Sequence, residues 1–350
     1  MTTTRSRHIL TLDAIRGLAA ISVLLIHIGW IGGDRSLARF GYLAVDLFFL
    51  MSGFVIARAY EQKLLAGMPW RRFMLLRIAR LYPSLLLGAL LGLAAHFVVA
   101  GATYHLGWYS AAHLVLLPDL TAREGIFPLN GVLWSLFFEL VVNAVHGLVV
   151  RRLTNLRLTL FVLAMGIAWA YAATHGGNWG GGWNGATFVS GFARVGWGYG
   201  AGVLLHRLHA ARWRIPAIVP IALAALALLM PPFGGAATVR IAISVFVLFP
   251  LIVMLAATSD VPPFASGAAR WLGAISYPLY AIHHPLLLMI ASRVSMRSGA
   301  REAAVAVTLV AAATIVELLY DAPIRKRLLG IVSERGSASD RLALDDADAR

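Results

Sequence analysis

The sequence contains no cysteine and few charged residues. Cysteine is absent from all 350 positions, which excludes disulfide bonds, cysteinyl-acyl intermediates, thiolate metal sites and S-palmitoylation. Only 13% of the residues are charged, about half the share typical of soluble domains, whereas 59% are hydrophobic. The shortage of charge indicates that water is not the main solvent of this chain. The absence of cysteine leaves His, Ser, Asp and Glu as the candidates for chemistry.

Long apolar runs take the place of the missing charge, and several reach the length of about 20 residues that a helix needs to cross a bilayer. We therefore predict an all-α fold, a polytopic membrane helical bundle with about ten transmembrane helices. The expected runs are 9–31, 41–60, 80–100, 131–150, 158–174, 186–206, 215–230, 239–257, 272–293 and 302–320. The 215–230 run is short and the 186–206 run is rich in glycine, so these two depart most from a typical span.

The formal net charge is +14, from 30 Lys and Arg against 16 Asp and Glu. Such an excess can indicate nucleic-acid binding, but here the basic residues are spread over many short loops. That distribution favours contact with an anionic membrane leaflet, so membrane lipid is the expected partner and nucleic acid is not. Alternate loops carry most of the basic residues, which predicts that both termini are cytoplasmic. Arg293, Arg297 and Arg301 run against the trend because this arrangement places them outside.

The chain is predicted to form one transmembrane domain, residues 1–330, followed by a short tail. A signal peptide is the alternative for the first apolar run. Asp13 and Arg16 inside that run, and the lack of a clear small-residue cleavage site, favour a retained helix. Residues 331–350 are small, polar and charged, a composition typical of disorder, so we expect a disordered cytoplasmic tail.

The first predicted helix carries Asp13, Arg16 and His27. Ionisable residues inside a membrane usually face the bundle interior or a water-filled cavity. Arg16 and His27 lie on nearly the same side of the helix, roughly 16 Å apart along its axis. They are expected to line one helix face at two depths. Arg16 can instead pair with Asp13 one turn earlier and serve only the structure.

Two acidic residues of other helices lie at a depth where they could serve His27. Asp46 is near the outer start of the second predicted helix, at a depth similar to that of His27. A carboxylate beside a histidine can orient the ring and stabilise its protonated form. Glu139 lies about a third of the way down the fourth predicted helix. The alternatives are a helix cap for Asp46 and helix–helix hydrogen bonding for Glu139, Asn143 and His146.

A pair of adjacent histidines, His283 and His284, lies near mid-membrane in the ninth predicted helix. Neighbouring residues on a helix point about 100° apart, so only one of the two is expected to face inward. Histidine and carboxylate side chains can hold zinc, but no HExxH-type spacing occurs in the sequence. We therefore expect no metal.

Four arginines, Arg71, Arg72, Arg77 and Arg80, lie in the loop that leads into the third apolar run, with Arg80 where the run begins. Arg77 and Arg80 are three residues apart and so share one helix face. Arginine forks suit the geometry of phosphate groups. The alternative is that these side chains anchor the helix at the cytoplasmic leaflet.

The polar segments together resemble the acyltransferase-3 family of integral-membrane O-acyltransferases over residues 9–327. LDAIRGLAAISVLLIH resembles the family's first helix, in which a basic residue, here Arg16, precedes a histidine, here His27. GYLAVDLFFLMSGFVIA resembles the second-helix motif, with Asp46 and Ser52. Arg77 and Arg80 match an RxxR motif, WSLFFEL matches a tryptophan-to-glutamate motif that ends at Glu139, and ISYPLYAIHHPLL matches a histidine motif in which His283 is the better candidate. Near the end the chain departs from the family, since Asp321 stands where members often have glutamate.

The resemblance implies transfer of an acyl group, most often acetyl, from cytoplasmic acyl-CoA to a hydroxyl of a glycan or small acceptor outside a bacterial-type inner membrane. With this chemistry we expect His27 to act as general base, or alternatively to accept the acyl group itself, oriented by Asp46 or Glu139, with the acyl-CoA arm passing Arg16. The expected residues for CoA phosphates are Arg72, Arg77 and Arg80, and those for the channel are Asp13, Ser52 and His283. Two other classes remain open, a secondary or proton-coupled membrane transporter and a non-enzymatic membrane scaffold. No feature of the sequence predicts an oligomeric state.

Overall fold

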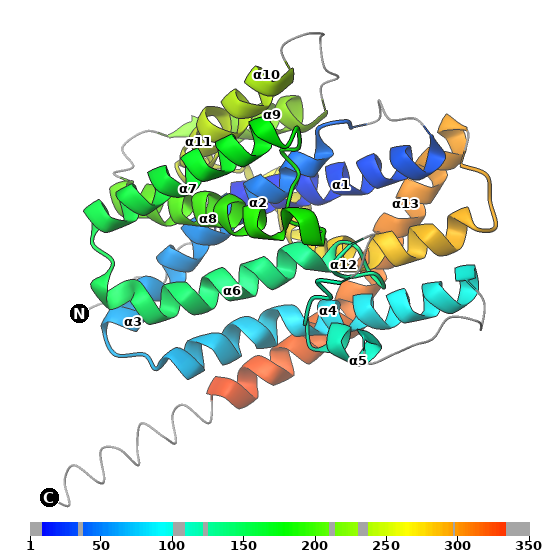
Figure 1. The fold of residues 1–350 in the computed structure, drawn as a ribbon, viewed down its shortest axis with the longest axis horizontal. Coiled ribbons are helices and arrows are strands. Elements are labelled where there is room, and N and C mark those ends of the chain that lie inside the picture. Colours follow the sequence, from blue (N-terminus) through cyan, green and yellow to red (C-terminus); the bar gives the residue numbers. More distant parts are fainter. Residues whose placement is uncertain are drawn as a thin grey trace, which may run out of the picture.

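A computed structural model describes residues 9–33, 38–100, 109–121, 125–209, 214–229, 237–296 and 298–333. These residues are mostly helical, which confirms the all-α class (Figure 1). Two strands of two residues each, β1 (Ile215–Pro216) and β2 (Ser259–Asp260), pair in parallel. The helices are α1 (Leu10–Gly32), α2 (Ala44–Ile56), α3 (Gln62–Leu65), α4 (Trp70–Ala100), α5 (Tyr109–Leu114), α6 (Leu133–Val149), α7 (Asn155–His175), α8 (Phe188–Leu208), α9 (Ile218–Leu229), α10 (Ala237–Ile243), α11 (Phe249–Ala257), α12 (Ser266–Ala291) and α13 (Gly299–Val316).

Eight helical segments of the described chain are long and apolar enough to cross a membrane. They are Leu10–Gly32, Gly41–Leu65, Trp70–Val99, Leu133–Arg152, Asn155–His175, Ala237–Ala257, Pro263–Ala291 and Gly299–Ser333. The other two predicted spans correspond to α8 and α9. α8 has 21 residues, but glycine, Arg194 and Arg207 lower its hydropathy, and α9 has 12 residues. α8 and α9 correspond to the 186–206 and 215–230 runs, which already departed most from a typical membrane span in the sequence.

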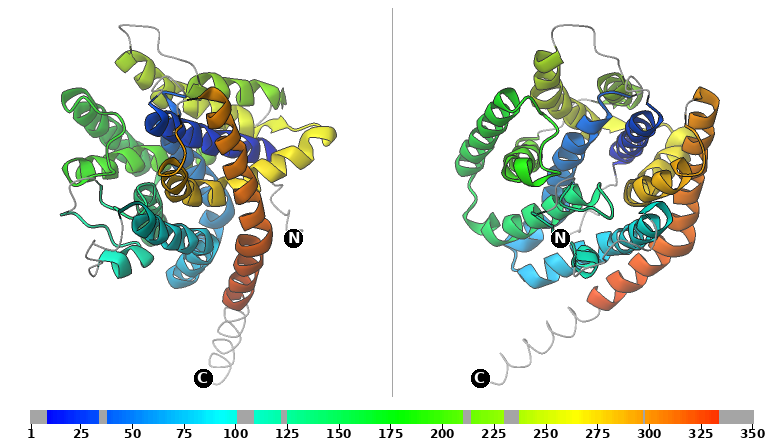
Figure 2. Two further views of the ribbon diagram at one scale, coloured as in Figure 1. Left: turned by 90° about the vertical axis from the view of Figure 1, so that its right-hand side faces the viewer. Right: turned by 45° about the vertical axis from the view of Figure 1, so that its right-hand side comes forward.

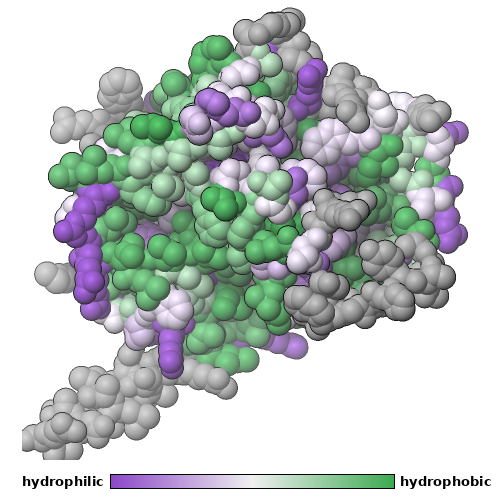
Figure 3. All heavy atoms as spheres, in the orientation of Figure 1, coloured by the Kyte–Doolittle hydropathy of each residue, from purple (hydrophilic) through white to green (hydrophobic). Residues whose placement is uncertain are grey.

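Hydrophobic side chains cover much of the middle of the bundle in the space-filling view, and hydrophilic ones form a strip at its left edge, with smaller groups at the right edge, in the upper part and at the bottom (Figure 3). The helix axes run roughly between these two edges in Figure 1. Such an apolar belt between polar ends is typical of a bundle embedded in lipid. Residues 331–333 continue the last helix, and the rest of the predicted tail lies outside the described residues.

The third helix begins earlier than the apolar run predicted. α4 extends from Trp70 to Ala100 and therefore includes the four arginines that the sequence placed in a loop. Its Pro83, like Pro278 and Pro285 in α12, lies within a helix. Proline is tolerated there in membranes because neighbouring helices and local adjustments satisfy the freed backbone groups. The longer helix fixes Arg77 and Arg80 on a rigid scaffold rather than on a loop.

The helices pack in two groups with α6 beside both. α12 lies against α1, α4 and α13, and α8 lies against α2 and α7, while α6 contacts α4, α2 and α8. Figure 2 shows this side-by-side arrangement, with the helix that starts at α13 crossing the outside of the bundle obliquely. Polar side chains of α1, α2, α4, α6 and α12 consequently meet between the two groups.

Glycine sets how closely α8 approaches α2. A Cβ atom on Gly202 would collide with the backbone of Leu50 and Phe54, and one on Gly53 would collide with the backbone of Tyr199. Small residues at helix crossings let two backbones come together and gain van der Waals contact. The glycines that made the 186–206 run atypical therefore form the surface with which α8 packs against α2.

The substitution Gly202→Ala is expected to lower the midpoint of thermal unfolding, because a backbone cannot move aside as a flexible side chain can. Overpacking of this kind costs about 1–3 kcal/mol. Gly267→Ala is the matched control, since Gly267 lies in α12 and its Cβ would meet nothing within 4 Å. Thermal unfolding of both purified variants in detergent tests this. Equal midpoints for the two variants would contradict the role of Gly202 in the close contact between α8 and α2.

Candidate active site

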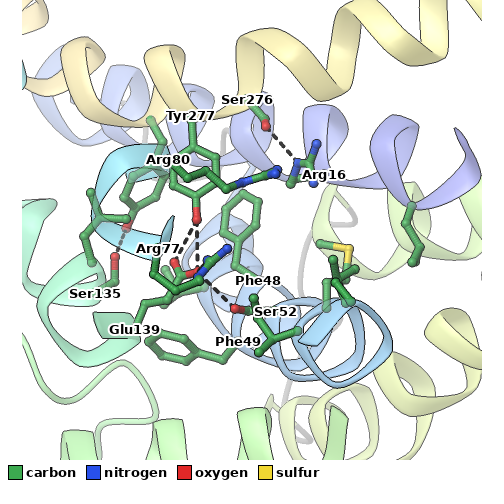
Figure 4. Close-up of a pocket in the computed structure, with 18 of the residues that line it drawn as sticks. Arg16, Phe48, Phe49, Ser52, Arg77, Arg80, Ser135, Glu139, Ser276 and Tyr277 are labelled. Atoms are coloured by element: carbon green, nitrogen blue, oxygen red, sulfur yellow. Dashed lines mark hydrogen bonds and ion pairs between the residues drawn. The ribbon is translucent and has the colours of Figure 1, made fainter. Parts of the chain in front are cut away.

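A cavity of about 160 Å³ lies between the two helix groups. This volume far exceeds the 10–15 Å³ or so that one water molecule requires. Its lining extends along the second helical span from Val45 to Tyr60, roughly 22 Å at 1.5 Å per residue. Most lining side chains are apolar, but several polar ones converge in it, as Figure 4 shows. These polar residues are Arg16, Ser52, Tyr60, Arg77, Arg80, Ser135, Glu139, Ser276, Tyr277 and Tyr280.

The Glu139 carboxylate is the centre of the polar network in this cavity. It accepts hydrogen bonds from the Ser52 hydroxyl at 2.9 Å and from the Tyr277 hydroxyl at 2.9 and 3.0 Å. Arg77 Nη2 lies 3.2 Å from Glu139 Oε1, as an ion pair and hydrogen bond. Glu139 thereby ties together α2, α4, α6 and α12. The structure directs it toward Arg77 and Tyr277 and away from the role of orienting His27.

Arg16 both pairs with Asp13 and lines the cavity. Its Nη2 donates to Asp13 Oδ1 at 2.7 Å and to the Gly273 carbonyl at 3.1 Å, and its Nε donates to Ser276 Oγ at 3.0 Å. The two alternatives drawn from the sequence, a local ion pair and a cavity residue, are therefore both realised. Asp13 itself is not among the lining residues.

The three cavity arginines differ in how their charge is balanced. Arg16 and Arg77 each face a carboxylate, whereas Arg80 has no hydrogen-bonding partner among the described residues. Figure 4 shows the guanidinium of Arg80 close to Arg16 in the same pocket. The cavity thus carries one uncompensated positive charge on an exposed side chain. Arg72, predicted to join this group, is five residues before Arg77, roughly 140° away on α4, and does not line the cavity.

His27 lies outside the cavity, in a cluster with both histidines of α12. Its ring centroid is 5.0 Å from that of His283 and 5.4 Å from that of His284. The prediction that only one of the two would face inward was wrong, because His27 approaches the helix between them. Trp30 packs edge-on against His27 at 5.2 Å and is 49% exposed.

The hydrogen bonds of this cluster assign the tautomer of His27. A carbonyl oxygen only accepts, so His283 Nδ1, 2.9 Å from the Leu279 carbonyl, is the protonated nitrogen of its ring. His27 Nδ1 lies 2.8 Å from the Val23 carbonyl and 3.3 Å from His283 Nε2, and it donates to both acceptors. His27 Nε2 then carries the free lone pair, as a general base requires.

Tyr280 stands between the cavity and the histidine cluster. Its ring lines the cavity and lies 6.0 Å from the ring of His283, and its hydroxyl is 2.7 Å from Ser135 Oγ. The continuous channel predicted from Arg16 to His27 is therefore interrupted by Tyr280 and His283. The sequence offered no signal for Tyr280 or Tyr277, because a tyrosine in an apolar run resembles ordinary core.

The prediction that Asp46 lies beside His27 was wrong. The Asp46 carboxylate accepts two hydrogen bonds from Arg194 of α8, from Nε at 2.6 Å and from Nη2 at 2.8 Å. Both side chains are almost fully buried. Arg194 also donates to the carbonyls of Gly181 and Tyr42. Asp46 therefore joins α2 to α8, and among the described residues no carboxylate is hydrogen-bonded to His27.

Two further ionic clusters join helices away from the cavity. Glu61 pairs with Arg207 at 2.6 Å and with His146 at 3.3 Å, and His146 in turn contacts the Tyr199 hydroxyl at 2.8 Å. These contacts agree with the interpretation that His146 forms hydrogen bonds between helices. Arg325 pairs with Glu317 and Asp321, and Asp321 also accepts from Ser84, so Asp321 is part of a structural cluster. Within the described ranges no group of three His, Asp or Glu residues is arranged to hold a metal ion.

The matching family model is that of an acyltransferase domain, acyltransferase 3, over residues 9–320. The chain is also 39% identical over 173 residues to "Protein 2 in picA locus" of Rhizobium radiobacter, an alignment that covers 44% of this chain and 88% of that protein. No solved structure matches the chain. The family range includes every residue that lines the cavity and the whole histidine cluster.

Proposed function

The chain belongs to the acyltransferase-3 family and is a membrane acyltransferase, and from this premise we propose the following reaction. The enzyme moves an acyl group, acetyl in the first instance, from cytoplasmic acyl-CoA to a hydroxyl group. The acceptor is a glycan or a related hydroxylated molecule outside a bacterial inner membrane. No metal takes part in this scheme.

The observation that supports the proposal is a cavity with an excess of positive charge that ends close to the histidine cluster of His27. The cavity contains Arg16, Arg77 and Arg80 with a charge excess at Arg80, and Tyr280 and His283 separate it from His27. A guanidinium without a carboxylate partner suits a phosphate of CoA. The roughly 22 Å of lining gives an extended pantetheine arm a path along the second helix.

The proposed chemistry is a direct transfer with His27 as general base. Nε2 of His27 takes the proton of the acceptor hydroxyl while its oxygen attacks the thioester carbonyl. The C–O ester bond forms, the C–S bond breaks, and the departing CoA thiolate takes the proton from the His27 imidazolium. The Val23 carbonyl and His283 hold Nδ1–H in place throughout, which keeps Nε2 available for the proton.

In this scheme Tyr280 is the side chain that must move. It closes the end of the cavity nearest His283, and Ser135 holds its hydroxyl there. Rotation of the Tyr280 ring lets the acyl group reach His27 and, on its return, shields the site from water. Such gating is a common way to prevent hydrolysis of a reactive donor.

The test is the ester-linked acyl content of surface glycans, measured by mass spectrometry. Deletion of the gene is expected to remove one acyl mass, and complementation with the wild-type chain is expected to restore it. The mass identifies the acyl group and the modified fragment identifies the acceptor. If deletion leaves every glycan ester unchanged, the glycan acceptor is wrong, and acyl-CoA consumption by membranes with small hydroxylated acceptors is the next assay.

Replacement of Arg80 by glutamine is expected to raise KM for acyl-CoA by about 10- to 100-fold, the effect of one charge-assisted hydrogen bond to phosphate. The rate at saturating donor should change far less, because Arg80 is remote from His27. Arg72→Gln is the matched control, since Arg72 is on the same helix but does not line the cavity. Equal KM values for the two variants would contradict the phosphate role of Arg80.

A further inference from the structure

A second hollow lies on the side of the bundle formed by α6, α7 and α8. It has a volume of about 370 Å³ and is lined mainly by aliphatic and aromatic side chains. Several of these side chains face outward, since Val145 is 50% exposed and Phe161 43%. We call it the α6–α8 groove. Its lining residues are Val142, Val145, His146, Val149, Arg152, Leu153, Arg157, Leu158, Phe161, Tyr199, Gly200 and Val203.

The interior of the groove offers no free polar group, although it includes a histidine and a tyrosine. His146 Nδ1 is 2.8 Å from the Tyr199 hydroxyl, and His146 Nε2 is 3.3 Å from Glu61. Both rings therefore present their carbon atoms to the groove. An occupant gains by burying hydrocarbon there, and a polar molecule would lose hydrogen bonds with water.

The rim of the groove is cationic. Arg152 and Arg157 are both exposed lining residues, and neither guanidinium faces a carboxylate among the described residues. The α6–α7 connection that carries them is held in place, because Arg157 donates to the Arg152 carbonyl at 2.7 Å and Arg207 donates to the Leu153 carbonyl at 2.6 Å. Figure 3 shows the hydrophilic left edge over this connection, with hydrophobic surface directly beside it.

We propose that the α6–α8 groove binds one anionic phospholipid of the cytoplasmic leaflet, with an acyl chain against Val142, Val145 and Phe161 and the phosphate between Arg152 and Arg157. The depth from Val149 to Val142 is about 10 Å along α6, which takes part of one chain. The arginines lie at the membrane end where the positive-inside rule places the cytoplasm. Basic pockets between helices on that side suit anionic headgroups. The proposal is independent of the acyl-transfer reaction.

The test is native mass spectrometry of the purified, delipidated full-length protein titrated with phosphatidylglycerol or with phosphatidylcholine of the same acyl chains. The wild-type protein is expected to retain one phosphatidylglycerol about tenfold more strongly than phosphatidylcholine. The double variant Arg152→Gln/Arg157→Gln is expected to lose that preference. Arg151→Gln is the matched control, because Arg151 is exposed on the same connection but does not line the groove, and it should bind as the wild type does.

A second variant, Val145→Phe, fills the groove from its exposed side without entering the core, and should reduce retention of both lipids at least fivefold. The proposal is overturned if the wild type retains the two lipids equally, or if the double variant behaves like Arg151→Gln. It is also overturned if Val145→Phe changes nothing. Displacement of phosphatidylglycerol by inorganic phosphate would show a free-anion site and would likewise overturn it. Unfolding midpoints of all variants confirm that each protein is folded.

Discussion

Replacing His27 by alanine is expected to lower the rate of acyl transfer by about 10²- to 10⁴-fold, the usual contribution of a general base. His27 and His283 both hold Nδ1–H against a backbone carbonyl, but Nε2 of His283 accepts from His27, whereas Nε2 of His27 keeps a free lone pair. The folded state should change little, because the ring is only partly buried and makes no ion pair. The measurement is acyl transfer in membranes that contain matched amounts of enzyme.

The control for this substitution is His175→Ala, which removes an exposed histidine at the end of α7. It should leave the rate unchanged. Normal transfer by the His27→Ala enzyme would eliminate the base mechanism. A loss of transfer together with a large fall in the unfolding midpoint would instead show that the histidine cluster is needed for folding.

Replacement of Asp46 by alanine is expected to destabilise the protein by about 3–5 kcal/mol, because it leaves a buried arginine without its counter-charge. Arg194 is 1% exposed, and its bidentate partner lies 148 residues away in the sequence. The expected result is a strong loss of monodisperse protein and a lower midpoint of thermal unfolding. The acyl-transfer rate per folded molecule should be close to that of the wild type.

The double variant Asp46→Leu/Arg194→Met separates a structural role from a chemical one. Replacing both members of a buried ion pair by apolar residues is often neutral or stabilising, so the double variant should recover much of the stability lost by Asp46→Ala. It should also transfer acyl groups. A stable but inactive double variant would show that Asp46 or Arg194 takes part in the reaction and would contradict a purely structural role of the pair.

The proposed reaction separates two tasks that the sequence had placed in one channel. In that proposal the donor binds in the cavity around Arg80 and Glu139, and the cluster around His27 transfers the proton, with Tyr280 between them. Glu139 is held by Ser52, Arg77 and Tyr277 rather than by His27. These partners account for a carboxylate in the middle of α6 without a continuous water channel.

The membrane environment, the fold class and the family of this protein can all be predicted from the amino-acid sequence alone. Run lengths and the shortage of charge define a membrane helical bundle, because lipid admits only segments that satisfy their own backbone hydrogen bonds. Helical periodicity also places Arg77 and Arg80 on one face. Both are properties of single segments, and for that reason they can be predicted without knowing which segments touch.

Which helices face one another depends on their packing in the folded protein. Only packing brings Arg194 of the glycine-rich α8 to Asp46, and only packing brings His27 between His283 and His284. Periodicity fixes the direction of a side chain on its own helix but not the neighbour that it meets. That neighbour depends on how closely backbones approach, which at α2 and α8 is set by Gly53 and Gly202. The pairing of the buried charges follows from that contact.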